Sequence, residues 1–188
     1  MPCLPRVILA SASPRRRELL QLLGVEFEVM ASGIHEQQLP DEDPSVFVAR
    51  LAREKAEDVA RRVAPIPAGT VVLGADTEVI LDGIAMGKPQ SDADAARMLR
   101  QLAGREHDVV TGLYLLPAGR GDVVLTRVWF DPMTDAEIAA YVATGEPHDK
   151  AGAYGIQGRA APFIPRIDGC YYNVMGLPVA ALRRLLSC

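Results

Sequence analysis

Apolar residues follow two different repeats along the first half of the chain, and the changes between them indicate its secondary structure. Aliphatic, β-branched runs over 6–10 and 70–81 predict strands, and so does the alternation of apolar and acidic residues over 25–30. Between these runs, apolar residues recur every three or four positions over 14–23 and again over 44–63, which predicts two amphipathic helices. Strands that alternate with helices favour an α/β protein.

The second half of the chain is richer in strands than the first. Its expected elements are, in chain order, a hairpin turn at Asp82-Gly83, a helix from Ser91 through Leu102, strands over 107–116 and 122–130, a helix opened by Thr134 and Glu137, and a C-terminal helix over 178–186. We expect a single domain over residues 1–188, built as a mixed twisted sheet with flanking helices and two lobes around a central cleft.

Composition and charge narrow the functional classes. The 188 residues are 49% hydrophobic and 23% charged, which is ordinary for a globular protein, and the formal charge is −4 with a pI of about 5.4. This balance favours neither nucleic acid nor an anionic membrane as a partner, and no apolar run approaches the length of a membrane span. The three scattered cysteines, Cys3, Cys170 and Cys188, fit a reducing cytosol, so we expect a cytoplasmic protein.

The segment that joins the first strand to the first helix is unusually basic. Ser13 is a good N-cap and Pro14 suits the first helical position, so we expect the helix to begin there. Its first turn carries three arginines, 15–17, although the positive end of a helix dipole favours acidic residues. A bound phosphate would explain them, with the hydroxyls of Ser11 and Ser13 nearby, and a solvated basic face is the alternative. The glycines and the Gly-Lys-Ser/Thr ending of a Walker loop are missing.

Two charged residues stand where the apolar pattern predicts burial. Lys55 falls on the apolar stripe of the helix over 44–63, where it either extends to solvent or directs its ammonium to an anion in a cleft. Asp76 interrupts the strand over 70–81, and a buried carboxylate needs an ion pair, a metal or a catalytic role. Small neighbours before Asp76 leave space for a ligand, which favours function over a purely structural pair. His107, alone at the start of a strand, is interpreted as structural.

These residues combine into one chemical hypothesis. Basic groups on separate elements, a buried aspartate and a glutamate on the polar loop over 32–40 suit a bound polyphosphate. Cations would hold the phosphates, while the carboxylates would hold a divalent metal and direct a water molecule. Hydrolysis of a phosphoanhydride needs this charge neutralisation and an aligned water more than it needs covalent catalysis.

Six motifs carry a family resemblance. They are Ser11-Ala-Ser-Pro-Arg-Arg16, Leu51-Ala-Arg-Glu-Lys-Ala56, Gly74-Ala-Asp-Thr77, Gly87-Lys-Pro89, the run from Asp149 to Gly158, and Asn173-Val-Met-Gly-Leu-Pro178. In this order and spacing the chain resembles the Maf family of nucleoside triphosphate pyrophosphatases over nearly its whole length. The resemblance implies a fold like that of inosine triphosphate pyrophosphatase, a homodimer, and dependence on a divalent metal, Mg or Mn. It also implies hydrolysis of a nucleoside triphosphate to the monophosphate and pyrophosphate, as housekeeping of the nucleotide pool.

The resemblance also implies roles for individual residues. Asp76 matches the family's proton acceptor, which activates water for attack on the α-phosphorus. The implied phosphate-binding cations are Arg16, Lys55 and Lys88. The positions that set substrate choice in the branch acting on dTTP and UTP are matched by Arg15, Thr77 and Gln157. Ser11 and Ser13 lie in the same substrate-binding signature.

Metal binding is implied by the resemblance for Glu36 and Asp76. Glu36 matches a catalytic-site carboxylate of the family that could hold the metal. Two residues depart from the pattern: His35 stands beside Glu36 where an acidic residue is expected, and Cys170 is a milder departure that we interpret as a packing residue. The loop over 32–40 therefore offers one carboxylate where the pattern has two.

Two alternatives to this function stay open. One is a non-catalytic, nucleotide-binding regulator of septum formation, although a pure sensor has little use for a buried Asp76 beside phosphate-binding cations. The other is the branch of the same family that acts on 7-methyl-GTP, against which Thr77 and Gln157 argue by resemblance. Modified pyrimidine triphosphates also fall within the expected substrate class.

Overall fold

The structure of the chain, a computed structural model, describes residues 4–187. The described residues form two units, each with its own hydrophobic core. The first unit comprises the residues up to Asp76, Thr111–Val124 and the residues from Gly176 onward. The second unit comprises Thr77–Val110 and Leu125–Met175. The expected cleft between two lobes stays a prediction.

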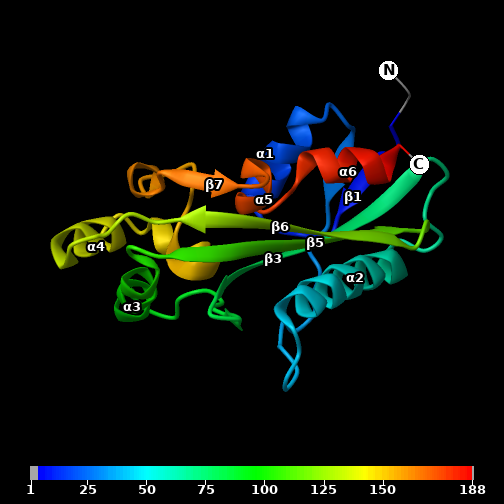
Figure 1. Cartoon of the computed structure of the whole chain (residues 1–188). Helices are drawn as coiled ribbons and strands as arrows, with labels where there is room; N and C mark the ends of the chain where they lie inside the picture. The colour runs from blue at the N-terminus through cyan, green and yellow to red at the C-terminus, as the bar shows by residue number, and fades with distance from the viewer. Residues whose placement is uncertain (1–3, 188) are drawn as a thin grey trace. The chain divides into compact units, whose positions relative to one another are not determined.

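Seven strands within residues 4–187 form one mixed sheet (Figure 1). They are β1 (Arg6–Leu9), β2 (Phe27–Val29), β3 (Thr70–Leu81), β4 (Ile84–Ala85), β5 (Glu106–Leu116), β6 (Arg120–Trp129) and β7 (Arg166–Asp168). Their order is β2-β1-β3-β5-β6-β7, with β4 paired to β3. β1 pairs in parallel with β2 and β3, whereas β4 is antiparallel to β3 and β7 to β6. The mixed sheet with flanking helices confirms the predicted α/β class.

The helices lie close to their predicted positions. They are α1 (Pro14–Leu22), α2 (Pro44–Arg62), α3 (Asp92–Leu102), α4 (Asp135–Val142), α5 (Tyr171–Val174) and α6 (Val179–Leu186), with 3-10 turns at Glu146–Asp149, Ala151–Ala153 and Ala161–Phe163. The hydrophobic repeats predicted the longer helices to within one or two residues, whereas α5, β7 and the 3-10 turns lie where those repeats are irregular. None of the helices in the described part of the chain is long and apolar enough to cross a membrane.

The structure describes one of the three cysteines that led us to expect a reducing compartment. Cys3 and Cys188 lie outside the described residues. Cys170 carries a free thiol and is partly buried. Its backbone N–H donates to Thr126 Oγ1 at 2.9 Å, and the same hydroxyl donates to the Cys170 carbonyl at 3.2 Å. The position of Cys170 is therefore fixed through its backbone rather than through sulfur chemistry.

In the first unit, α2 packs against the strands at two glycines. A Cβ at Gly74 would overlap the carbonyl of Ala52, and a Cβ at Gly112 would overlap the carbonyl of Val48. Both carbonyls belong to α2, so this helix rests directly on the backbones of β3 and β5. Within this unit, α2 lies on one side of the strands, and α1 and α6 lie on the other (Figure 1). This close packing fixes where the side chains of α2 emerge.

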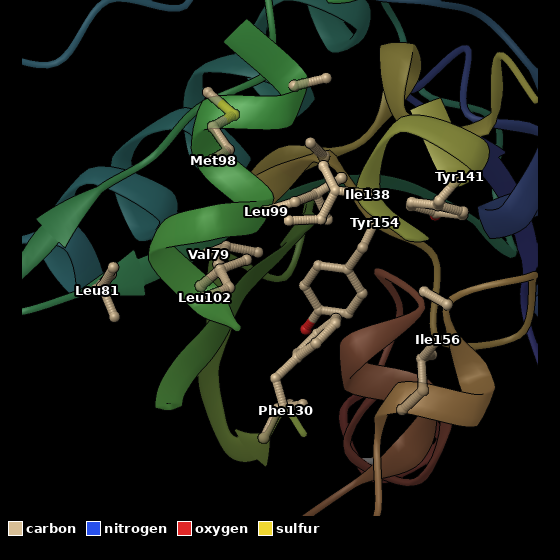
Figure 2. Packing of buried hydrophobic residues seen from close by; sticks show 14 of the residues in the cluster. Val79, Leu81, Met98, Leu99, Leu102, Phe130, Ile138, Tyr141, Tyr154 and Ile156 are labelled. Carbon is tan, nitrogen blue, oxygen red and sulfur yellow. The ribbon is translucent and has the colours of Figure 1, made fainter. Parts of the chain in front are cut away.

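In the second unit, a cluster of buried hydrophobic residues surrounds Tyr154 (Figure 2). The Tyr154 ring lies edge-on to Phe130, with ring centroids 4.9 Å apart. His107 is also buried there, and its Nε2 lies 2.7 Å from the Tyr154 hydroxyl. Burial lowers the pKa of His107 from 6.5 to about 4, so the ring is neutral at pH 7. The structural interpretation of His107 agrees with this position in a core.

Candidate active site

The most notable charged group in the first unit is a buried lysine held between two carboxylates. Lys55 projects from the apolar face of α2, and its Nζ lies 2.5 Å from Asp76 Oδ1 on β3. The same Nζ lies 2.7 Å from Glu36 Oε1. The side chains of Lys55 and Asp76 are each only 6% exposed, whereas that of Glu36 is 46% exposed. The alternative in which Lys55 extends to solvent is therefore wrong, and the cluster reaches solvent through Glu36.

Asp76 is only partly satisfied by this contact. Its Oδ1 accepts a hydrogen bond from Lys55 Nζ, but its Oδ2 is buried and has no hydrogen-bond partner among the described residues. A buried carboxylate oxygen without a partner is costly, and native proteins keep few of them. Oδ2 is therefore the atom at which a water molecule or a cation would be stabilised.

Glu36 lies on the loop over residues 31–43. Asp58 and Arg62 of α2 hold the part of this loop that precedes Glu36. Asp58 Oδ2 accepts a hydrogen bond from the Gly33 backbone N–H at 3.1 Å. Arg62 donates to the Ala31 carbonyl at 2.7 Å and to Asp58 at 3.0 Å. The hydrogen bond from Gly33 is the largest cause that lowers the pKa of Asp58. Sequence reasoning missed this contact, although the i,i+4 spacing of Asp58 and Arg62 is a visible signal for an ion pair on a helix.

A second set of contacts holds the 31–43 loop beyond Glu36. Arg50 on α2 donates to both oxygens of Glu42, each at 2.7 Å, and to the Gln37 carbonyl at 3.0 Å. The paired hydrogen bonds from Arg50 lower the pKa of Glu42, and those to Glu42 raise the pKa of Arg50. Glu36 thus lies between two sets of contacts with the helix that carries Lys55. Sequence reasoning missed this set as well.

The basic turn of α1 contains one deeply buried arginine. Arg16 Nη1 donates to Ser11 Oγ at 2.9 Å, and its Nε donates to the Gly176 carbonyl at 2.9 Å. Burial lowers the pKa of Arg16, while the charges of Asp76 and Glu36 oppose that shift. The alternative of a solvated basic face is therefore wrong for Arg16, which carries its charge close enough to the two carboxylates to feel their field.

The N-cap of α1 is as predicted. Ser13 Oγ accepts the Arg16 backbone N–H at 3.5 Å, and Pro14 occupies the first helical position. Arg15 follows on the partly buried side of the turn. Ser11 and Ser13 therefore contact the two ends of Arg16, one at its guanidinium and one at its backbone. This arrangement brings the predicted residues of the Ser11 to Arg16 motif together around one arginine.

Three predicted site residues belong to the second unit. Thr77 follows Asp76 directly in β3 and is partly buried. Lys88 is exposed, and its carbonyl accepts a hydrogen bond from the Gln90 side chain at 3.1 Å. Gln157 is exposed on the loop that follows Tyr154. The positions of these residues relative to Lys55 stay a prediction.

The carboxylates around Lys55 were tested as a metal site. Within residues 4–187, no group of three or more His, Cys, Asp or Glu side chains could hold a metal ion. Glu36 and the unpartnered Oδ2 of Asp76 remain as two hard oxygen donors. Mg²⁺ characteristically takes one or two protein carboxylates and completes its shell with water and substrate phosphates, and Mn²⁺ also suits oxygen ligands. The residues therefore fit a divalent cation that is shared with a bound phosphate, and His35 is not needed.

The fold and these contacts define a class of protein, namely a mixed α/β protein with a buried acid centre held by a lysine. The chain belongs to the Maf family, because the family model described as Maf-like protein matches residues 6–188. Relatives that are 51% and 52% identical over 95% and 96% of this chain agree with this membership.

The chain is similar to several curated relatives, each named dTTP/UTP pyrophosphatase. That of Geobacter metallireducens is 51% identical over 183 residues, covering 95% of this chain and 93% of the relative. That of Geobacter sulfurreducens is 52% identical over 188 residues and covers 96% of each chain. That of Shigella sonnei is 50% identical over 182 residues, covering 95% and 90%. Among solved structures, the Staphylococcus aureus Ham1 protein is similar at 16% identity and a TM-score of 0.46, over 69% of this chain and 72% of that one.

Proposed function

We propose that this chain hydrolyses dTTP and UTP to the nucleoside monophosphate and pyrophosphate. The observation that carries the proposal is the buried Oδ2 of Asp76, which has no hydrogen-bond partner among the described residues while Lys55 holds the other oxygen. Support also comes from three relatives that are 51%, 52% and 50% identical to this chain, because each of them is named dTTP/UTP pyrophosphatase. The enzyme would remove these nucleotides from the pool.

The proposed reaction is a single displacement at phosphorus. Asp76 Oδ2 accepts a proton from water, and the water oxygen attacks the α-phosphorus. The bond from the α-phosphorus to the bridging oxygen breaks, and pyrophosphate leaves with that oxygen. Lys55 fixes the Asp76 carboxylate through Oδ1, so that Oδ2 keeps one orientation. The oriented base aligns the attacking water, and the phosphate-binding cations supply the charge neutralisation that this reaction also needs.

Substrate binding is assigned to the remaining predicted residues. Arg16, Lys55 and Lys88 would neutralise the phosphates, and Ser11 and Ser13 would donate hydroxyl hydrogen bonds to them. Arg15, Thr77 and Gln157 would set the choice of substrate. The Gln157 amide offers both a donor and an acceptor, which a uracil or thymine edge requires.

A divalent cation, Mg²⁺ or Mn²⁺, is proposed as the cofactor. Glu36 and Asp76 would hold it. When bound, it supplies positive charge that offsets the charge of the phosphate oxygens. Lys55 contacts the same two carboxylates, so it limits their mutual repulsion whether or not the cation is present.

One experiment tests the function and its alternatives together. The protein is incubated with Mg²⁺ or Mn²⁺ and a panel of triphosphates, namely dTTP, UTP, CTP, GTP, 7-methyl-GTP and modified uridine triphosphates, and pyrophosphate release is measured. We expect the highest kcat/KM with dTTP and UTP, and loss of activity in excess EDTA. A preference for 7-methyl-GTP would assign the chain to the other branch. Tight binding of a triphosphate without pyrophosphate release would overturn the enzyme and favour the regulator of septum formation.

The assembly and the compartment belong to the same proposal. We expect a homodimer, which sedimentation equilibrium of the purified protein would measure as twice the mass of the chain. We expect the enzyme to act in the cytoplasm, where its nucleotide substrates are found. Fractionation of cells that express the chain would test this location.

A further inference from the structure

The loop of the second unit that carries Gln157 is wrapped around one glutamate. A Cβ at Gly158 would overlap the carboxylate of Glu146, and a Cβ at Gly155 would lie 3.1 Å from Glu146 Oε1 and 2.8 Å from Lys150 Cε. Neither glycine has a positive φ, so space rather than backbone conformation requires them. The two glycines that flank Gln157 therefore make room for the carboxylate of Glu146.

Hydrogen bonds connect the same carboxylate to both ends of the loop. Glu146 Oε2 accepts the backbone N–H of Arg159 at 3.0 Å, and Glu146 Oε1 accepts the hydroxyl of Tyr141 at 2.8 Å. The Tyr141 oxygen in turn accepts the backbone N–H of Gly155 at 3.1 Å. Residues on each side of Gln157 are thus joined through one carboxylate and one phenol.

Apolar side chains hold the loop from its inner side. Tyr154 and Ile156 are 5% and 6% exposed and belong to the hydrophobic cluster of the second unit, in which the Tyr154 ring lies beside Phe130 (Figure 2). Gln157, the next residue, is exposed. The loop therefore has a buried inner face and a hydrogen-bonded outer edge, and Gln157 is the polar side chain that this framework presents.

We propose that Glu146 is a positioning residue that orients Gln157 for recognition of the pyrimidine base. This inference rests on the proposed function, in which Gln157 reads the base edge. Recognition by an amide depends on its direction, because exchange of donor and acceptor matches a different base. Loss of the Glu146 contacts frees the segment over 155–159, so Gln157 loses discrimination while the chemistry at Asp76 persists.

The first test compares Glu146→Ala with a matched control on the same part of the fold. Glu137 closes the capping box of α4, and its hydrogen bonds among the described residues are with Thr134 rather than with the 155–159 segment. We expect Glu146→Ala to lower the ratio of kcat/KM for UTP over CTP by about tenfold, mainly through KM for UTP. Glu137→Ala should destabilise α4 and leave that ratio within about twofold of the wild type. Equal ratios in the wild type and Glu146→Ala would overturn the proposal.

Gly158→Ala provides a second, independent variant. Its Cβ displaces the Glu146 carboxylate, so in the wild-type background we expect a loss of discrimination close to that of Glu146→Ala. In the Glu146→Ala background the carboxylate is absent, and Gly158→Ala should change the ratio by less than about twofold. Losses that multiply in the double variant would overturn the shared role of this contact.

Hydrogen exchange separates failure of this inference from failure of the proposed function. The amides of Gly155 and Arg159 should exchange at least about tenfold faster in Glu146→Ala than in the wild type or Glu137→Ala. If the wild type releases no pyrophosphate from dTTP or UTP, the proposed function fails, and these two amides still decide whether Glu146 orders the loop. Unchanged exchange at both amides would overturn the positioning role.

Discussion

Each of the two units contains one buried polar pair. In both pairs one atom lacks a hydrogen-bond partner among the described residues, but the two pairs differ in charge and surroundings. In the first unit, Lys55 pairs with Asp76, and Asp76 Oδ2 has no hydrogen-bond partner within residues 4–187. In the second unit, His107 pairs with Tyr154, and His107 Nδ1 has no partner within the same residues. Both pairs are almost fully buried. Their surroundings decide which of the two unpartnered atoms is useful.

The difference lies in charge and in access to solvent. The Lys55 pair is ionic and continues to Glu36, whose side chain is 46% exposed, so the cluster extends to solvent. His107 is enclosed by the rings of Phe130 and Tyr154, and burial keeps it neutral. A buried polar pair thus indicates a site when it stays charged and connects to solvent, and a core when it is neutral and enclosed.

The largest effect is expected for the acid of the first pair. Asp76→Asn removes the proton acceptor, so kcat should fall by about 10³-fold while nucleotide binding stays within about threefold. Steady-state kinetics and calorimetric titration with UTP would measure both. The control is Asp82→Asn in the turn directly after β3, where an exposed ion pair with Arg105 contributes little and activity should be unchanged. An Asp76→Asn enzyme with most of its kcat would remove Asp76 from this role.

The next effect concerns the charge balance of the same pair. Lys55→Met leaves the Asp76 carboxylate buried opposite an apolar side chain, so the free energy of unfolding should fall by about 3 kcal/mol. Adding Asp76→Asn removes the uncompensated charge and should restore a large part of the loss. Urea denaturation at pH 7 measures each variant. A double variant as unstable as the sum of its singles would contradict an ion pair.

The second pair predicts a dependence of stability on pH. The pKa of His107 is about 4 in the folded chain and 6.5 in the unfolded chain, so between these values the unfolded state binds a proton that the folded state does not. Stability is therefore lost as the pH falls from 6.5 to 4, by up to about 3 kcal/mol. His107→Gln should flatten the plot of unfolding free energy against pH in this window. Equal slopes in both proteins would refute the assignment to His107.

The smallest effect is expected where the first pair meets solvent. Asp58→Ala removes the acceptor for the Gly33 N–H and frees one end of the 31–43 loop that carries Glu36. We expect kcat/KM to fall by about three- to fivefold and the free energy of unfolding to change by less than about 1 kcal/mol. Glu57→Ala, one residue away on α2, is the matched control, because Glu57 forms an ion pair with the exposed Arg53. Identical kinetics in the two variants would contradict a role for Asp58 in placing Glu36.

Sequence reasoning reached the elements and the buried charges because both are visible along the chain. A lysine in a helical apolar stripe and an aspartate in an apolar strand stand out from their neighbours. Their direct pairing was not visible, since Lys55 and Asp76 are 21 residues apart and meet only because α2 rests on β3 at Gly74. The glycines around Gln157 are visible in the sequence, but the carboxylate of Glu146 that lies against them is seen only in the structure.

The residues that sequence reasoning missed share a physical character. Arg50, Asp58 and Glu146 are polar side chains that hold loops through backbone groups, and surface charges of this kind are common and carry no repeat. The short strand β7 and the helix α5 were missed because segments of three or four residues show no period. Roles for Thr77, Lys88 and Gln157 depend on the family resemblance and stay predictions.

The direct packing of α2 on Gly74 and Gly112 limits which substitutions this protein can accept in evolution. Because main-chain atoms touch there, the separation of helix and strand does not depend on which side chains fill the neighbouring core. A side chain at either glycine would displace α2 and with it the tip of Lys55. The position of Lys55 beside Asp76 therefore depends on glycine being kept at positions 74 and 112.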